Sequence, residues 1–237
     1  MGKDKIKRFR ENESFDCLYQ PDFEEVFRVP YYMKGKWNSH HFKNNNPVVL
    51  ELGCGRGEYT VELSQKYPHI NFIGVDIKGA RMWRGAKTVT EQKITNAAFV
   101  RSRIEFIESV FGDGEVSEIW ITFPDPQMKR ENRRLTSSFF LERYRKFLKN
   151  GGVVHLKTDS PFLHNYTLQL VRQNGLELVE ANDDIYGTGR ADDLLSIKTR
   201  YEKEFLSKGI KITYLSFKLK HESVLSEPVW NQSLYER

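Results

Sequence analysis

Val48-Val49-Leu50-Glu51-Leu52-Gly53-Cys54-Gly55-Arg56-Gly57-Glu58 decides the fold of this chain. The apolar half reads as a buried strand, and Tyr59, Leu63 and Tyr67 then recur every four positions, as in a helix packed on a sheet. Three glycines stand between strand and helix, where the backbone needs positive φ and a ligand needs to approach without meeting a Cβ. The stretch therefore predicts a strand, a ligand-binding turn and a helix.

The glycine spacing indicates which ligand the turn binds. A dinucleotide fingerprint, G-x-G-x-x-G, would need its third glycine at position 58, where this chain has Glu58. The pattern G-x-G-x-G, with Glu51 near the strand's end, resembles motif I of the S-adenosylmethionine (SAM) dependent class I methyltransferases. The resemblance implies that Glu51, Gly53 and Gly55 bind SAM. A carboxylate suits the cationic groups of SAM and would suit a pyrophosphate poorly.

A second carboxylate follows at the distance that such a site requires. Residues 71–76 form a short apolar strand that ends in Asp76, 23 residues after Gly53, and the usual separation is about 20 residues. Asp76 can accept hydrogen bonds from both ribose hydroxyls of an adenosyl group. The alternative is a buried strand that happens to end in Asp, and the company of Glu51 and the glycines disfavours it.

Length and composition point to one α/β domain, and the positive net charge suggests a polyanion as its partner. The 237 residues fit a single domain of this class, 39% hydrophobic residues suffice for a core, and no apolar run approaches the roughly 20 residues of a membrane span. Two cysteines are too few for a disulfide framework, and no histidine pair has metal-ligand spacing. A cytoplasmic protein without a metal is expected, as a monomer or a homodimer.

The net charge of +5 is concentrated in two basic clusters. Residues 78–103 hold seven basic residues against Glu91 alone, and residues 129–149 hold eight against Glu131 and Glu142. Each cluster follows an expected ligand-site strand, which favours nucleic acid as the partner. A solvated basic face is the alternative for either cluster taken singly.

Residues 1–46 lack sustained periodicity, and Asn44-Asn45-Asn46-Pro47 marks a boundary before the first strand. We expect an N-terminal extension over 1–46, either an arm that touches RNA or a disordered tail, followed by a methyltransferase domain over 47–237.

A rigid acidic turn follows the fourth expected strand, which covers residues 118–123. In Pro124-Asp125-Pro126 the two prolines fix φ on either side of the carboxylate, at the strand end where open α/β sheets bind ligands. Asp125 as a mere turn former is the alternative. A basic loop, residues 127–135, comes next, and then a helix expected to end at Gly151-Gly152.

Phe123-Pro124-Asp125-Pro126, a lysine soon after, and Arg133-Arg134-Leu135 resemble the signature of the bacterial tRNA (guanine-N7)-methyltransferases. The strand ending Thr158-Asp159 and the helix start Thr199-Arg200-Tyr201-Glu202 also match that family. This chain departs from it in having Gln127 where relatives usually have Trp, no His in the loop, and a loop about two residues shorter. The matched motifs span residues 48–217.

The resemblance implies a fold, a reaction and a set of residues. The fold is an α/β class I methyltransferase, Rossmann-like, with a seven-stranded, mostly parallel sheet, helices on both faces and an antiparallel last strand. The reaction is transfer of the SAM methyl group to N7 of a guanine in the tRNA variable loop. The implied residues are Asp125 for catalysis; Glu51, Gly53, Gly55, Asp76, Arg103 and Asp125 for SAM; Lys129, Asp159, Thr199, Arg200, Tyr201 and Glu202 for the substrate; and Arg133 and Arg134 for the RNA backbone.

Alternatives remain open at this point. Thr199 can be a helix N-cap and Tyr201 a core aromatic, and Arg133 and Arg134 can be structural, paired with Glu131 or Glu142. The protein as a whole could methylate a small molecule or a protein, or bind RNA without activity. A dehydrogenase is the weakest reading because of Glu58.

Overall fold

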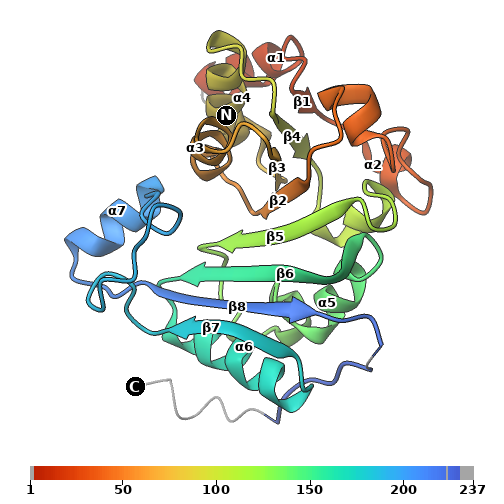
Figure 1. Ribbon diagram of the computed structural model, residues 1–237. Helices are drawn as coiled ribbons and strands as arrows, with labels where there is room; N and C mark the ends of the chain where they lie inside the picture. Colours follow the sequence, from red (N-terminus) through yellow and green to blue (C-terminus); the bar gives the residue numbers. More distant parts are fainter. Residues whose placement is uncertain (1–2, 223, 230–237) are drawn as a thin grey trace. The chain divides into compact units, whose positions relative to one another are not determined.

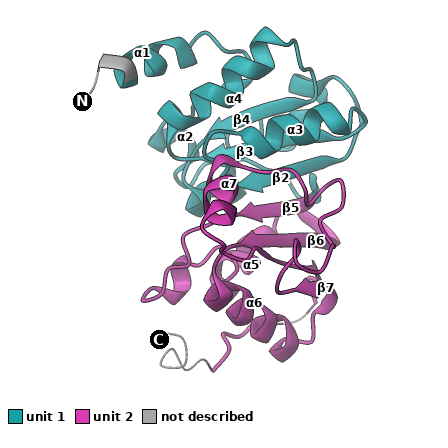
Figure 2. Ribbon diagram, turned by 90° about the vertical axis from the view of Figure 1, so that its left-hand side faces the viewer, with its two compact units in different colours: residues 1–117 teal, residues 118–237 magenta. Residues whose placement is uncertain are grey.

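The computed structural model describes residues 3–222 and 224–229, and the chain divides into two compact units, 1–117 and 118–237 (Figure 2). The boundary between the two units falls after residue 117 and not at residue 46. The expected division into an N-terminal extension over 1–46 and a methyltransferase domain stays a prediction. Within the described residues, each unit contains four paired strands with helices packed on them (Figure 1).

The first unit is built on a parallel sheet with the strand order β1-β4-β3-β2. In chain order it contains α1 (Lys3–Asn12), β1 (Leu18–Tyr19), α2 (Phe23–Val26), the π-helical segment η1 (Trp37–Phe42), β2 (Val48–Leu52), α3 (Glu58–Lys66), β3 (Asn71–Asp76), α4 (Gly79–Glu91), β4 (Ala97–Arg101) and the 3₁₀ segment η2 (Ile104–Ser109). The strand expected before Gly53 and the strand expected at 71–76 are both present, as β2 and β3.

Helices α3 and α4 cover one face of this sheet. Val61 of α3, Met82 and Ala86 of α4 and Phe99 of β4 belong to one buried apolar cluster. All five residues of β2 are buried, as expected for a strand covered on both sides.

The N-terminal segment contains short elements that the sequence pattern did not show. The two-residue strand β1 pairs in parallel with β4, and Trp37 and Met33 are almost completely buried. Because β1 adds to the seven expected strands, the described residues contain eight.

The second unit has the strand order β5-β6-β8-β7, and β8 runs antiparallel to both of its neighbours. In chain order it contains β5 (Val116–Thr122), which begins just before the unit boundary, the 3₁₀ turn η3 (Glu131–Arg133), α5 (Ser138–Tyr144), β6 (Leu148–Thr158), α6 (Pro161–Gln173), β7 (Glu177–Asn182), α7 (Arg200–Ser207) and β8 (Thr213–Leu219). The α/β class and the antiparallel last strand are therefore confirmed.

One expected boundary in this unit is wrong. Gly151 and Gly152 do not cap α5, which ends at Tyr144, but lie inside β6. Gly151 has a φ of +73°, so the strand passes a conformation there that only glycine adopts readily.

Candidate active site

The glycine turn after β2 has the conformation that its sequence predicts. Gly53, Gly55 and Gly57 all have positive φ, at 79°, 55° and 71°. A Cβ added at Gly53 or Gly55 would meet no atom closer than 3.9 Å, whereas one at Gly57 would lie 2.4 Å from the ring of Phe99. The first two glycines therefore leave open space beside the turn, and the third allows close packing inside the unit.

Asp76 fastens this turn to the end of β3. Its Oδ2 accepts a hydrogen bond from the Gly55 backbone N–H at 2.9 Å, and its Oδ1 accepts one from the Lys78 N–H at 2.8 Å. The carboxylate is only half-buried, and each oxygen has a second lone pair. Asp76 can thus brace the turn and accept hydroxyl groups of a ligand at the same time.

Glu51 is buried more deeply than a direct contact with SAM would require. Its side chain is buried, and Oε2 accepts hydrogen bonds from the backbone N–H of Thr60 at 3.0 Å and from the Thr60 hydroxyl at 2.5 Å. The carboxylate therefore ties β2 to the first turn of α3, where negative charge is favoured by the helix dipole.

Arg103 is the residue before the 3₁₀ segment η2, and its side chain is exposed. Its carbonyl accepts hydrogen bonds from the Ser102 hydroxyl at 3.2 Å and the Phe106 N–H at 3.0 Å. Its contact with the cofactor stays a prediction.

In the second unit, Asp125 is exposed in a constrained turn after β5. Phe123 and Gln127, on either side of the Pro-Asp-Pro sequence, both have a φ of +49°, a conformation that costs a non-glycine residue of order 1 kcal/mol or more. The Asp125 Oδ1 accepts a hydrogen bond from the Gln127 N–H at 3.0 Å. Backbone strain retained on both sides of an exposed carboxylate is typical of a functional site.

Arg134 holds the basic loop after this turn in place through hydrogen bonds. This differs from the expectation that Arg134 contacts RNA. Its side chain has no exposed surface, and its guanidinium donates to the carbonyls of Gln127 and Met128 at 3.3 and 3.1 Å. It also stacks 4.4 Å from the centre of the Tyr166 ring. A buried guanidinium cannot reach a phosphate, so Arg134 supports the loop, while Arg133 and Lys129 are exposed.

Glu202 is likewise buried, although it was expected to contact the substrate. Its carboxylate forms an ion pair with Lys157 of β6 at 2.7 Å, and neither side chain is exposed. The Lys157 ammonium also donates to the carbonyls of Leu195 and Ile197, at 2.7 and 3.0 Å. Burial lowers the pKa of Lys157, and the Glu202 carboxylate opposes that shift. The pair therefore fixes α7 and the segment before it against the sheet.

The remaining expected residues of α7 stand at its exposed end. Thr199 is the N-cap, and its hydroxyl accepts a hydrogen bond from the Glu202 N–H at 3.2 Å, which confirms that reading. Tyr201 is 44% exposed, so the core-aromatic reading is wrong, and Arg200 is also exposed. Phe205 of the same helix packs against Phe123, with ring centres 6.0 Å apart. The second unit thus brings α7 next to the residue that begins the Asp125 turn.

Asp159 directly follows β6 and is half-buried, and this burial raises the pKa of its carboxyl group. The Phe123 N–H donates to the Lys157 carbonyl at 2.8 Å, which ties the end of β5 to the end of β6. The carboxylates of Asp125 and Asp159 therefore follow two strand ends that are linked by a hydrogen bond.

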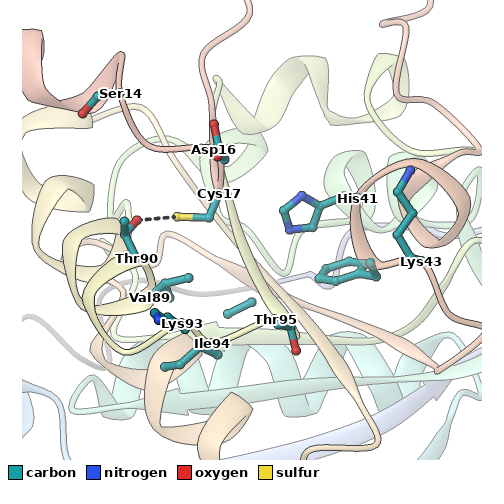
Figure 3. A pocket seen from close by; sticks show the side chains of 12 residues that line it. Ser14, Asp16, Cys17, His41, Lys43, Val89, Thr90, Lys93, Ile94 and Thr95 are labelled. Carbon is teal, nitrogen blue, oxygen red and sulfur yellow. Dashed lines mark hydrogen bonds between the residues drawn. The ribbon is translucent and has the colours of Figure 1, made fainter.

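A cavity of about 550 Å³ opens elsewhere in the first unit (Figure 3). Its lining includes Cys17, His41, Thr90 and Ala97 and none of the expected site residues. Ala97 begins β4, whereas Arg101 at the other end of β4 pairs in register with Asp76. The cavity therefore lies at the strand ends opposite the glycine turn.

Among the described residues, no group of three or more His, Cys, Asp or Glu is placed to hold a metal ion. No helix in the same part of the chain is long and apolar enough to cross a membrane.

Comparison with known proteins decides the family. The model of a family described as putative methyltransferase matches residues 45–215. A tRNA (guanine-N(7)-)-methyltransferase of Christiangramia forsetii is 53% identical over 222 residues, which are 92% of this chain and 99% of that protein. The chain belongs to the tRNA (guanine-N7)-methyltransferase family. A Bacteroides fragilis relative of the same name is 50% identical over 96% of this chain and 90% of its own length.

Solved structures agree on the fold of this family member. The 16S rRNA methyltransferase KamB superposes with a TM-score of 0.62 at 14% identity, over 82% of this chain and 97% of that chain. A 16S rRNA (adenine(1408)-N(1))-methyltransferase variant from Catenulisporales acidiphilia, crystallised with cosubstrate SAM, gives a TM-score of 0.54 at 15% identity, over 81% of this chain and 91% of that one. The class I methyltransferase fold is therefore established.

Proposed function

We propose that this protein is a cytoplasmic enzyme that transfers the methyl group of SAM to N7 of a guanine in the variable loop of tRNA. Relatives named for guanine-N7 methylation of tRNA share about half of their residues with this chain over nearly its whole length, which supports the proposal. The structural observation that carries it is Asp125, an exposed carboxylate held in a strained turn next to a basic loop.

The residues of the first unit fit SAM. The open space beside Gly53 and Gly55 admits a ligand against the backbone, and the half-buried Asp76 carboxylate can accept ribose hydroxyls. When bound, SAM supplies an electrophilic methyl group on a sulfonium. Glu51, fixed by Thr60, places negative charge behind the turn and favours a cationic ligand over a phosphate.

The chemistry of guanine N7 matches the side chains of the second unit. N7 carries an in-plane lone pair and no proton, so its alkylation requires alignment of the two reactants more than a general base. Asp125 can accept hydrogen bonds from guanine N1–H and N2–H, and thereby orient the base. Asp159 and the exposed Tyr201 would make further contacts with the nucleotide, and Lys129 and Arg133 contacts with its phosphates.

Methyl transfer from labelled SAM to bulk tRNA tests the proposal. The same reaction is run with total protein and with a small-molecule extract as acceptors. We expect label in tRNA alone. Label in protein or small molecules would favour a methyltransferase of another specificity, and binding of tRNA without any transfer would favour an inactive RNA-binding protein.

Cofactor affinity should depend on the glycine turn and Asp76. We expect Gly55→Val and Asp76→Ala to weaken SAM binding strongly, because the first fills the open space with a side chain and the second removes the acceptor that also holds the Gly55 N–H. Titration calorimetry measures the affinity. The control is Gly114→Val, because Gly114 has a φ of +59° and similarly open surroundings in a different turn. Wild-type affinity in both site variants would refute this placement of the cofactor.

Arg133 and Arg134 should behave differently although they are neighbours. We expect Arg133→Gln to lower the log-log salt slope of tRNA binding by roughly 0.7 to 0.9, the loss of one phosphate contact. Arg134→Gln should instead lower the free energy of unfolding by about 1–3 kcal/mol, because it leaves two part-buried carbonyls of the loop without their donor. Filter binding over a salt series and urea unfolding measure the two effects. An unchanged slope for Arg133→Gln would mean that this exposed arginine does not touch the RNA.

A further inference from the structure

Helix α1 is firmly attached to the first unit on one side. The Asn12 side-chain amide, almost fully buried, donates to the Gly79 carbonyl at 2.9 Å, and the Arg101 guanidinium lies 5.0 Å from the centre of the Phe9 ring. A Cβ at Gly79 would approach Arg101 to 2.8 Å and Phe9 to 3.1 Å. The absence of a side chain at Gly79 thus lets α1 pack directly on the beginning of α4.

Polar contacts extend this attachment along α4. The carboxylate of Glu11 accepts hydrogen bonds from the Trp83 indole N–H at 2.8 Å and from the Lys87 ammonium at 3.2 Å. The Arg8 guanidinium lies 4.9 Å from the centre of the Trp83 ring. Figures 1 and 2 show α1 beside α4, in agreement with these contacts.

The exposed charged residues between positions 5 and 10 and between positions 78 and 84 are all basic, whereas Glu91 at the end of α4 is exposed and pairs with Lys87 at 3.8 Å. Between residues 5 and 10, α1 has four basic residues and no acidic one, and between residues 78 and 87 the α4 region has four more and again no acidic one. The exposed members are Lys5, Lys7, Arg8, Arg10, Lys78, Arg81 and Arg84. Glu11 is already used in the attachment. Basic side chains held this close repel one another, and a polyanion relieves that repulsion.

The position of this basic surface connects it to the cofactor-binding end of the unit. Gly79 is three residues after Asp76, and Arg101 pairs in register with Asp76 at the end of β4. Gly79 and Arg101, two of the residues that contact α1, therefore lie near the carboxylate assigned to SAM. An RNA backbone bound along α1 and α4 would lie at the same strand ends as the cofactor turn.

We infer that α1 and α4 together form a phosphate-binding surface for the tRNA substrate. The inference rests on the proposed function and adds a part of the tRNA contact to it. In this arrangement the N-terminal helix is a fixed element of the enzyme, held by Phe9, Asn12 and Glu11, and its lysines and arginines receive the RNA backbone. Phosphate contacts of this kind position the RNA and carry no sequence information.

The test is a triple variant of the full-length protein, Lys5→Gln with Lys7→Gln and Arg10→Gln. Glutamine has nearly the helix propensity of lysine and arginine, so α1 should persist. The matched control changes two exposed lysines and one exposed arginine at other places in the unit, Lys36→Gln, Lys43→Gln and Arg28→Gln, with the same loss of charge. Lys43 lines the cavity at the opposite strand ends.

We expect the triple variant to bind tRNA about ten- to a hundredfold more weakly near 0.15 M salt, with a log-log salt slope lower by about 2 to 3. The control should differ much less from the wild type. The KM for tRNA should rise, while kcat at saturating tRNA, SAM affinity and the unfolding midpoint remain unchanged.

Two results would overturn the inference. One is tRNA binding by the triple variant no weaker than that of the control. The other is a loss of SAM affinity or of the unfolding midpoint that accounts for the weaker binding, because α1 would then be a structural element only. Failure of the proposed function looks different, since the wild-type protein itself would then transfer no methyl group to tRNA.

Discussion

Asp125→Ala should lower kcat about 10²- to 10³-fold, or roughly 3 to 4 kcal/mol, while SAM affinity stays near that of the wild type. Methylation places positive charge on the guanine ring. A carboxylate bonded to guanine N1–H and N2–H therefore interacts more strongly with the transition state than with the ground state, and such differential interaction raises kcat. Single-turnover rates with SAM and tRNA both saturating measure the effect.

Two further variants separate charge from loop structure. Asp125→Asn keeps an oxygen that can accept the hydrogen bond of the Gln127 N–H but loses the charge, so we expect it to be nearly as slow as Asp125→Ala. Asp113→Ala changes an exposed aspartate that precedes β5 and should leave the rate unchanged. A near-wild-type rate for Asp125→Ala would contradict the assignment of Asp125 as a catalytic residue. A parallel fall of SAM affinity would mean that Asp125 acts on the cofactor side.

Lys157→Met should lower the free energy of unfolding by about 3–5 kcal/mol, because it leaves the buried Glu202 carboxylate without its cationic partner. The same change removes the donor of two carbonyls in the segment before α7. Replacing both members, Lys157→Met with Glu202→Leu, should restore a large part of the loss, since no charge then remains buried. Urea unfolding followed by circular dichroism gives these free energies.

The control for this pair lies at the C-terminal end of α7, the helix that contains Glu202. Lys208 and Glu204 also form an ion pair at 2.7 Å, but both side chains are about half exposed. We expect Lys208→Met to leave the free energy of unfolding unchanged within error, because water screens exposed pairs. Equal losses for Lys157→Met and Lys208→Met would contradict the structural role assigned to the buried pair.

The glycine turn and the position of Asp76 beside it could be predicted because their signals are local. Gly53, Gly55 and Asp76 stand at strand ends that the change from period two to period 3.6 marks in the sequence. The turn conformations follow from the glycines themselves. The Pro-Asp-Pro turn could also be predicted from neighbouring residues alone. The positive φ of Phe123 and Gln127, on either side of it, is strain that the two prolines did not predict.

The role of Glu202 could not be found in this way, whereas a structural role for Arg134 was among the alternatives, and Glu131, three residues earlier, is its ion-pair partner at 4.0 Å. Glu202 and Arg134 are both charged residues in a polar stretch, and such residues are seldom fully buried unless they are paired. Glu202 is paired with Lys157, 45 residues earlier in the chain, and Arg134 stacks on Tyr166, 32 residues later. Contacts over such separations depend on tertiary structure and leave no periodic trace in the sequence.

The N-terminal segment was missed for a different reason. Its elements are short, and β1 has only two residues, so no window is long enough to show a period. Its order comes from contacts with α4 and β4, such as those of Asn12 and Leu18, which the sequence alone does not reveal.

The measurement that tests the central claim most directly is the identity and position of the methylated nucleoside. Wild-type protein and Asp125→Asn are incubated with labelled SAM and tRNA, the product is digested to nucleosides, and the modified position is mapped along the RNA. We predict 7-methylguanosine in the variable loop from the wild-type protein, and a much slower appearance of the same product from the variant. A methyl group on another atom or another base, or none in tRNA at all, would contradict the account.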